Sequence, residues 1–260
     1  MNILEKIVSH KEQEVETQSI IVPIERLKSS QRLFAVRDFK QALLGSEIQI
    51  IAEIKRCSPS ENDIMLDADP VQVSVSYEAN GANAISVLTD QHYFCGHLDF
   101  IQQVKASVKL PILRKDFIIS EYQVWESFQA GADAILLIAD AIDYSLLIKL
   151  YELSCELGMH TLVESHGMES LESIVKLSPD IVGVNCRNLQ SMKTDIRLFE
   201  SSYSKLPINS IKIAESGIKT RDNLRYIADL GYDSALVGTS LMQTGSPGIA
   251  LAELLNRVPA

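Results

Sequence analysis

The sequence repeats a short pattern at intervals of 50 residues. Gly-Ala-Asn-Ala-Ile begins at Gly81, Gly-Ala-Asp-Ala-Ile at Gly131 and Gly-Tyr-Asp-Ser-Ala at Gly231, while Ser-Pro-Asp-Ile begins at Ser178, in the matching place. Each copy closes an amphipathic segment and enters an apolar run. Because a strand and its helix take roughly 25 residues, each interval has room for two such units. The repeat therefore predicts eight strand–helix units arranged in four similar quarters.

Eight apolar runs fit this count, and each is short enough to be a buried strand. They span residues 48–54, 84–88, 111–113, 134–139, 161–163, 181–184, 211–214 and 234–237. Strands that alternate with helices imply a parallel sheet, and closing that sheet gives an α/β fold of the (β/α)8, or TIM, barrel type. An open, doubly wound sheet is the alternative, but the even repeat favours closure.

The first 45 residues have a different pattern. Residues 1–18 are amphipathic, with Ile3, Ile7 and Val15 among charged and polar residues, and predict a helix. A break at Pro23 precedes a second predicted helix over residues 31–44, ended by Gly45. We expect a helical extension, 1–45, packed on a barrel, 46–260, as a single domain. A chain of 260 residues suits this arrangement.

Composition excludes several classes of partner. A net charge of −10 and the lack of a long basic run argue against nucleic-acid binding, and no apolar run approaches a membrane span. The amino terminus is charged from its first residues and lacks the apolar core of a signal peptide, so we expect a cytoplasmic protein. The four cysteines form no Cys-x-x-Cys pair and are predicted to be free thiols. The five histidines show no convincing ligand spacing, so no metal site is expected.

Ionisable residues gather where the predicted strands end. Residues two apart on a strand point to the same face, so Glu53 and Lys55 share one face at the end of the first strand. An isolated pair of this kind could be a structural ion pair. Five further strand ends carry polar groups, however, and chemistry in (β/α)8 barrels sits at that end. Those groups are Lys115, Glu164, Asn185 with Arg187, Glu215 with Ser216, and Thr239 with Ser240.

The last two loops predict a phosphate site. Ser216-Gly217 and Gly238-Thr239-Ser240 offer hydroxyls and close backbone access where helices begin, and helix amino termini bind anions. An ordinary turn and helix cap is the alternative reading. Phosphate sites of these barrels lie at the loops after the seventh and eighth strands, so we favour phosphate.

Five motifs together resemble the indole-3-glycerol phosphate synthase family, and the likeness spans nearly the whole chain. They are Ile-Ala-Glu-Ile-Lys-Arg at 51–56 with Ser-Pro-Ser at 58–60, Ser-Val-Leu-Thr-Asp at 86–90 with Tyr-Phe at 93–94, Leu-Arg-Lys-Asp-Phe at 113–117, Val-Asn-Cys-Arg-Asn-Leu at 184–189, and Glu-Ser-Gly-Ile at 215–218. Two departures stand in loops. Glu61-Asn62 replaces the family's usual Lys-Gly, and His97 replaces its usual Ser.

The resemblance implies a carboxy-lyase of tryptophan biosynthesis that needs no cofactor. Its substrate would be the anionic sugar phosphate 1-(2-carboxyphenylamino)-1-deoxyribulose 5-phosphate, which is closed, decarboxylated and dehydrated to indole-3-glycerol phosphate. The likeness also implies a monomer or a weak dimer.

The family's residue roles transfer to matching positions. Lys115 would be the general acid, Glu164 the base or iminium stabiliser, and Lys55, oriented by Glu53, would hold the substrate carboxylate. The remaining roles concern binding. The sugar hydroxyls would be held by Asn185, Arg187, Glu215 and Ser216, and the aromatic ring would lie against Phe94, Phe117 and Leu189. The phosphate would be held by Ser58, Gly217, Gly238 and Thr239, and Leu236 is also expected to contact the substrate.

Three rivals stay open on the sequence. Phosphoribosylanthranilate isomerase uses a catalytic cysteine at the end of the first strand, whereas Cys57 comes two residues after Lys55. A flavin-binding barrel oxidoreductase would purify yellow. A non-catalytic sugar-phosphate-binding barrel would have lost members of the charged set, all of which are present.

Overall fold

The chain forms a closed barrel of eight parallel strands, as the repeat predicts. A computed structural model describes residues 2–188 and 192–260. The strand order around the barrel is β1-β10-β9-β8-β7-β6-β5-β4, and β1 pairs with β4 to close it. The barrel strands are β1 Gln49–Ile54, β4 Ala84–Leu88, β5 Ile112–Lys115, β6 Ala134–Ile138, β7 His160–Ser165, β8 Ile181–Asn185, β9 Ile211–Glu215 and β10 Ser234–Val237. The eight predicted strands and the (β/α)8 fold are confirmed.

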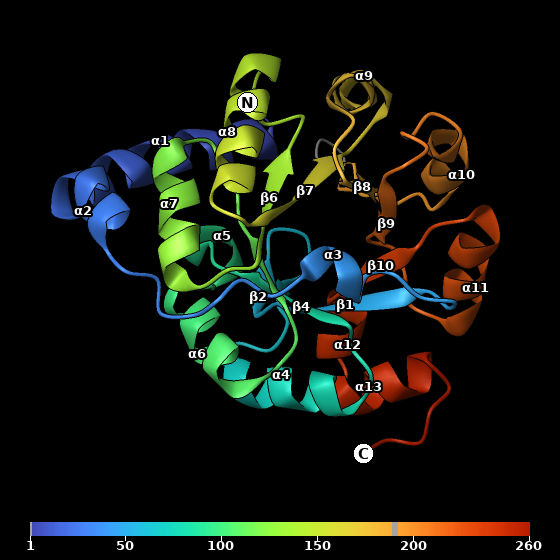
Figure 1. Ribbon diagram of the computed structural model, residues 1–260. Coiled ribbons are helices and arrows are strands. Elements are labelled where there is room, and N and C mark those ends of the chain that lie inside the picture. The colour runs from blue at the N-terminus through green and yellow to red at the C-terminus, as the bar shows by residue number, and fades with distance from the viewer. Residues whose placement is uncertain (1, 189–191) are drawn as a thin grey trace.

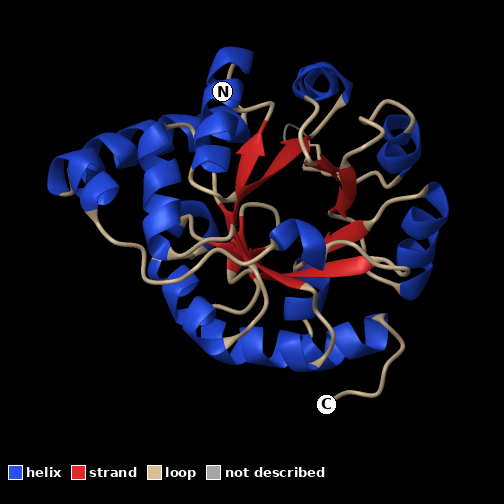
Figure 2. Cartoon of the chain, in the orientation of Figure 1, coloured by secondary structure: helices blue, strands red, loops and turns tan. Residues whose placement is uncertain are grey.

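Helices surround the barrel and cover its outer face (Figures 1 and 2). The helices that follow the barrel strands are α4 Pro70–Ala79, α5 Gln91–Phe94, α6 Asp99–Ser107, α7 Glu121–Ala130, α8 Tyr144–Glu156, α9 Met168–Leu177, α10 Arg197–Tyr203, α11 Arg221–Leu230, α12 Thr239–Met242 and α13 Pro247–Leu254. A hairpin of β2 Cys57–Ser58 and β3 Asn62–Asp63 follows β1. None of the helices in the described residues is long and apolar enough to cross a membrane.

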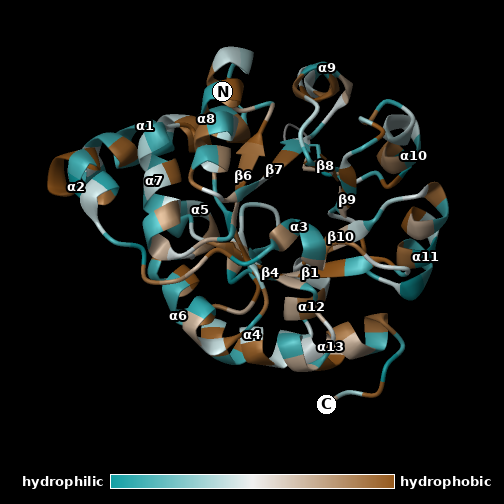
Figure 3. Cartoon of the chain, in the orientation of Figure 1, coloured by the Kyte–Doolittle hydropathy of each residue, from teal (hydrophilic) through white to brown (hydrophobic). Residues whose placement is uncertain are grey.

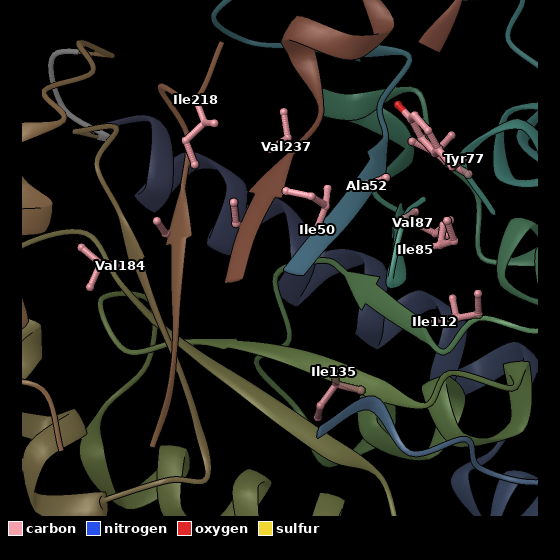
Figure 4. Packing of buried hydrophobic residues seen from close by; sticks show 14 of the residues in the cluster. Ile50, Ala52, Tyr77, Ile85, Val87, Ile112, Ile135, Val184, Ile218 and Val237 are labelled. Carbon is pink, nitrogen blue, oxygen red and sulfur yellow. The ribbon is translucent and has the colours of Figure 1, made fainter. Parts of the chain in front are cut away.

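Side chains alternate along each strand between two apolar cores. Ile50 and Ala52 of β1 point outward and pack with Val87 and Ile112 in the layer between strands and helices (Figure 4). Ile51 points inward and belongs to a separate cluster that fills the barrel. Strands such as β6 are correspondingly apolar, whereas the surrounding helices carry polar residues on their outer faces (Figure 3). The alternation places Glu53 and Lys55 on the inward side, above Ile51.

The repeated motif closes the amino-terminal end of the barrel. Gly81, Gly131 and Gly231 have φ angles of +98°, +97° and +96°, and Ser178 at the fourth place has +51°, so all four turn the chain through the left-handed region. Two residues after each glycine, a side-chain oxygen accepts the N–H of a residue at the start of an adjacent strand. These three bonds join Asn83 to Ile50, Asp133 to Ile112 and Asp233 to Lys212, each at 2.8 Å.

The amino-terminal extension covers both ends of the barrel. Helix α1, Ile3–Ile21, reaches the carboxyl end of the strands, where Ile7 joins the inner core beside Phe117. After α2, Ile24–Ser29, the chain runs along the outside to α3, Phe39–Ala42, which crosses the amino-terminal end (Figure 1). Phe39 is fully buried there. The helix predicted over the first 18 residues is therefore confirmed.

The second helix, predicted over residues 31–44, is wrong except at α3. Residues 31–38 form neither helix nor strand, because their arginines are hydrogen-bonded to the barrel. Arg32 donates to the carbonyls of Phe128 and Ala132, and Arg37 donates to those of Lys105 and Leu110. These contacts bind distant segments, so they override the local helical pattern.

The prediction that all four cysteines are free thiols is also wrong. Cys57 and Cys95 form a disulfide, whereas Cys155 and Cys186 are free. The two partners are 38 residues apart in sequence and meet because β1 and β4 are neighbours in the closed barrel. The bridge joins the loop after β1 to the loop after β4.

Candidate active site

Three glutamates and two lysines from different strands meet inside the carboxyl end of the barrel. Lys55 Nζ lies 2.6 Å from Glu53 Oε1 on β1. Lys115 Nζ, at the end of β5, lies 2.8 Å from Glu164 Oε2 of β7 and 3.4 Å from Glu215 Oε2 of β9. The carboxylate-bearing side chains are almost completely buried, whereas Lys115 keeps 12% of its side-chain surface exposed. The predicted meeting of these five strand-end residues is therefore observed.

Burial and the neighbouring charges favour different protonation states for Lys115, Glu164 and Glu215. Burial alone would lower the pKa of Lys115, but the carboxylates of Glu164, Glu215 and Glu53 outweigh it and raise the pKa above its ordinary value. Burial would raise the pKa of Glu164, yet Lys115 and His166 lower it well below the usual range. Burial and the charge of Glu164 raise the pKa of Glu215. The arrangement thus favours a charged lysine, an ionised Glu164 and a protonated Glu215.

An apolar lobe of the cavity lies beside Lys115. Phe94 and Phe117 form one wall, with ring centroids 6.0 Å apart, and Leu136 and Ile138 of β6 also line the lobe. This position agrees with the aromatic contact expected for both phenylalanines. Leu189, expected to join them, lies outside the described residues.

The extension supplies two further residues that the sequence analysis missed. Ile3 and Ile7 of α1 line this apolar lobe, although they lie more than 40 residues before the first barrel strand. They appear in the sequence as an ordinary amphipathic helix, and no signal there indicates contact with the cavity.

A second, more polar lobe contains the two glycine-containing loops. Gly217 and Lys219 after β9 line it with Gly238, Thr239 and Ser240 after β10. Ser216 and Gly217 both adopt left-handed backbone, with φ of +69° and +71°. Leu236 of β10 also lines this lobe, as do Glu61 and Gln243. Ser58, predicted beside the phosphate, lines the apolar lobe instead.

The two lobes meet at a group of shared residues. Glu53, Lys55, Arg187, Met192 and Ser216 line both lobes. Asn185 projects into the apolar lobe, and its Nδ2 donates to Glu164 Oε1 over 3.3 Å. A long substrate could therefore lie with one end in each lobe and its middle over the ionisable residues.

The hairpin after β1 borders both lobes. Ser60 accepts a hydrogen bond from Arg187 Nη1, and the same nitrogen lies 3.8 Å from Glu61 Oε1. Asn62 has a φ of +53°, a left-handed conformation that asparagine tolerates better than most residues, which fits its place where the family usually has glycine. His97, the other departure, lies away from the cavity with its ring half-exposed beside Asp99.

His166 is the charged-cluster member that the sequence analysis overlooked. Its side chain is 7% exposed, lines the apolar lobe, and places Nε2 2.5 Å from Glu164 Oε1. The signal was available, because His166 follows Glu164 by two residues at a strand end, the same spacing that relates Lys55 to Glu53. No group of three or more histidine, cysteine or acidic side chains within residues 2–188 and 192–260 is placed to hold a metal ion.

Comparison with known proteins identifies the family of this chain. The sequence profile of a family described as "Indole-3-glycerol phosphate synthase" matches residues 4–254. The chain belongs to the indole-3-glycerol phosphate synthase family. The enzymes of that name from Alkaliphilus metalliredigens and Chlorobium phaeovibrioides are 38% and 41% identical to it, over 254 and 244 residues. The first alignment covers 97% of both chains, and the second covers 93% of this chain and 95% of the relative.

Solved structures of lower similarity share the fold. The N-acetylmannosamine-6-phosphate 2-epimerase of Clostridium perfringens superposes with a TM-score of 0.62 at 17% identity, over 85% of this chain and 97% of the epimerase. The thiamine phosphate pyrophosphorylase of Pyrococcus furiosus gives 0.58 at 14% identity, over 84% of this chain and 96% of the other. At such identities the likeness concerns the barrel alone.

Family membership confirms the main functional prediction. Indole-3-glycerol phosphate synthases are carbon–carbon lyases of tryptophan biosynthesis that act on a phosphorylated small molecule. The motif resemblance in the sequence therefore identified the family correctly.

Proposed function

We propose that the mouth of this barrel closes the indole ring of 1-(2-carboxyphenylamino)-1-deoxyribulose 5-phosphate. The observation that carries the proposal is Lys115, which lines the apolar lobe and meets Glu164 and Glu215 there. Glu53 and Lys55 line both this lobe and the glycine-lined lobe. The substrate has an aromatic carboxylate at one end and a phosphate at the other. Each end thus has a lobe of matching chemistry.

Lys115 is the proposed general acid of the ring closure. The ring carbon that bears the carboxylate attacks the ribulose carbonyl, and the carbonyl oxygen takes a proton from the Lys115 ammonium as the carbon–carbon bond forms. The raised pKa of Lys115 keeps that proton in place before reaction. Positive charge then builds on the substrate nitrogen, and the ionised carboxylate of Glu164 stabilises it.

Loss of carbon dioxide and water completes the reaction. Carbon dioxide leaves with its bonding electrons returned to the ring system. The new hydroxyl then departs as water after protonation, and the CH2 group between it and the nitrogen gives up a proton to the carboxylate of Glu164, which forms the double bond of the indole. Lys55 holds the substrate carboxylate and assists this dehydration, while Glu53, 2.6 Å away, orients it. The substrate's own nitrogen supplies the electrons for these steps.

The second lobe is the proposed phosphate site. Gly217, Gly238 and Thr239 bring backbone and one hydroxyl to the anion, with Lys219 and Leu236 at its edge. Between the lobes, Asn185, Arg187, Glu215 and Ser216 would hold the sugar hydroxyls. Sulfate or phosphate soaked into crystals should occupy the second lobe, and an anion bound instead beside Lys115 would reverse this orientation.

The direct test is formation of indole-3-glycerol phosphate by the purified chain. The proposal predicts product at a saturable rate without any added cofactor. A chain that binds the substrate but forms no product would favour the non-catalytic rival, and a yellow preparation would favour a flavin enzyme. Cytoplasmic location and a monomeric or weakly dimeric state stay predictions.

A further inference from the structure

His166 lies in a pocket of acceptors at the end of β7. Its Nδ1 is 3.0 Å from the carbonyl oxygen of Arg187, and its Nε2 is 2.5 Å from Glu164 Oε1. The second contact is a close ion pair rather than an aligned hydrogen bond. The backbone N–H of His166 donates to Asp140 Oδ2 over 3.0 Å, which fixes the residue from the β6 side.

These neighbours determine the protonation state of the ring. A carbonyl oxygen only accepts, so Nδ1 must carry a hydrogen. A neutral ring would then turn the Nε2 lone pair toward the carboxylate of Glu164, which is repulsive. Only the imidazolium, with a hydrogen on both nitrogens, suits both partners.

We propose that His166 is a positioning residue that acts as an imidazolium, holding Glu164 ionised and turned so that its second oxygen meets Lys115. The ring contacts Oε1 of Glu164, which leaves Oε2 at 2.8 Å from Lys115 Nζ. The inference rests on the function proposed above and adds a residue to it. His166 thereby helps to give the two buried glutamates different protonation states. Glu164, beside the ring, is ionised, whereas Glu215 is protonated.

The charged groups around the ring agree on the direction of its titration. Burial would lower the pKa of His166, but Glu164 of β7, the Arg187 carbonyl after β8 and Asp140 after β6 raise it above the ordinary value of 6.5. The guanidinium of Arg187 is directed toward Ser60 and Glu61. Lys115 of β5 meets the same glutamate from the opposite side. The imidazolium is therefore present below the raised pKa and is lost as pH rises through it.

Nuclear magnetic resonance of the isotope-labelled full chain tests the ion pair without any activity assay. His166, assigned by comparison with His166→Gln, should titrate above 6.5 and show both ring N–H groups at neutral pH. Glu164→Gln should lower that pKa, because it removes the facing charge. A His166 ring that is neutral at neutral pH, with a pKa at or below 6.5 that Glu164→Gln does not change, would overturn the proposal. This holds whether or not the chain makes product.

Steady-state kinetics tests the consequence for the reaction. His166→Gln should lower kcat about 10-fold or more with KM changed little, and it should remove the alkaline fall in kcat that His166 deprotonation causes. His160→Gln is the matched control, since His160 starts the same strand at the opposite end of the barrel, 3.4 Å from Asp38. Should His166→Gln fold poorly, His166→Asn serves in its place. Wild-type kcat with an unchanged alkaline limb in a folded variant would contradict the role.

Discussion

Among single residues, Glu61 places a carboxylate in the second lobe, where phosphate is proposed to bind. Its carboxylate lies 3.8 Å from Arg187 Nη1 and 3.5 Å from the Gln243 amide nitrogen, and it lines the proposed phosphate site. A carboxylate there repels phosphate and competes with it for Arg187. The half-exposed position keeps the effect modest.

Glu61→Gln should therefore lower the KM for the sugar phosphate roughly 2- to 5-fold, the range expected for a screened charge pair. Initial rates at varied substrate concentration would measure it. Glu47→Gln is the matched control, because Glu47 also forms an exposed ion pair, 3.9 Å from Arg257. A KM for Glu61→Gln that equals or exceeds that of the unchanged chain would show that this charge does not oppose the substrate.

Gly238 and Thr239 should respond very differently to substitution. A Cβ on Gly238 would come within 2.6 Å of Glu53 Oε1, so Gly238→Val should displace the residue that orients Lys55. We expect kcat/KM to fall about 100-fold, as small displacements of catalytic groups commonly produce. Thr239→Ala removes one neutral hydroxyl and should raise KM only about 5-fold, equivalent to about 1 kcal/mol. Equal effects of the two substitutions would contradict this division.

Among structural elements, the Cys57–Cys95 disulfide joins two loops that border the cavity. Cys57 precedes Ser58 and Cys95 follows Phe94, and both neighbours line the apolar lobe. Closing a loop of 38 residues restricts the unfolded chain, a contribution of about 4 kcal/mol in the chain-entropy model.

Reduction of this disulfide should lower the melting temperature by on the order of 10 °C. Calorimetry with and without a reducing agent would measure the change. The double variant Cys57→Ser with Cys95→Ser should have the melting temperature of the reduced chain, and the reducing agent should not change it. Four titratable thiols in the unreduced, denatured chain would show that the bridge is absent.

Helix α1 is held to the barrel mouth by a buried lysine. Lys11 Nζ lies 2.9 Å from Asp90, 3.0 Å from Asp116 and 2.9 Å from Glu14, with no exposed side-chain surface. Burial would raise the pKa of Asp116, but Arg114 and Lys11 lower it to about 2. The stability that Asp116 contributes is thus fully present above its unfolded value of 3.8 and is lost as pH falls toward 2.

Lys11→Met should lower the free energy of unfolding by about 3 kcal/mol, because it leaves two buried carboxylates without their ammonium. Urea unfolding at neutral pH would measure the loss. Lys40→Met, which breaks the exposed pair with Asp180 at 3.0 Å, should cost at most about 1 kcal/mol. Similar losses for both variants would argue against a special role for the buried lysine. We also propose that the extension and barrel form one domain, so that Lys11→Met should still unfold in a single transition.

At the scale of the whole molecule, local patterns predicted the strands but not the contacts between distant segments. The eight strands could be found because each is a short, largely apolar run that turns ionisable only at its end, as Ile51 followed by Glu53 shows. The ionisable residues at the mouth could be found by the same alternation, and applying it consistently would have added His166.

The predictions that were wrong or incomplete all concern segments that meet only in the closed barrel. The spacing between Cys57 and Cys95 carries no signal, because their proximity arises from the pairing of β1 with β4. Residues 31–38 lose their predicted helix to hydrogen bonds from Arg32 and Arg37 to distant carbonyls. Ile3 and Ile7 reach the cavity because α1 crosses the mouth, a packing that its own sequence does not specify.

The central claim is that Lys115 supplies the proton for ring closure, and the turnover of Lys115→Ala tests it most directly. Formation of indole-3-glycerol phosphate at saturating substrate should fall at least about 100-fold while the chain folds normally. Lys105→Ala is the control, since Lys105 is even more buried than Lys115 and pairs with Asp133 at the opposite end of the barrel. Its loss should reduce stability but leave kcat of the folded enzyme intact. A folded Lys115→Ala variant that turns over at nearly the unaltered rate would contradict the account.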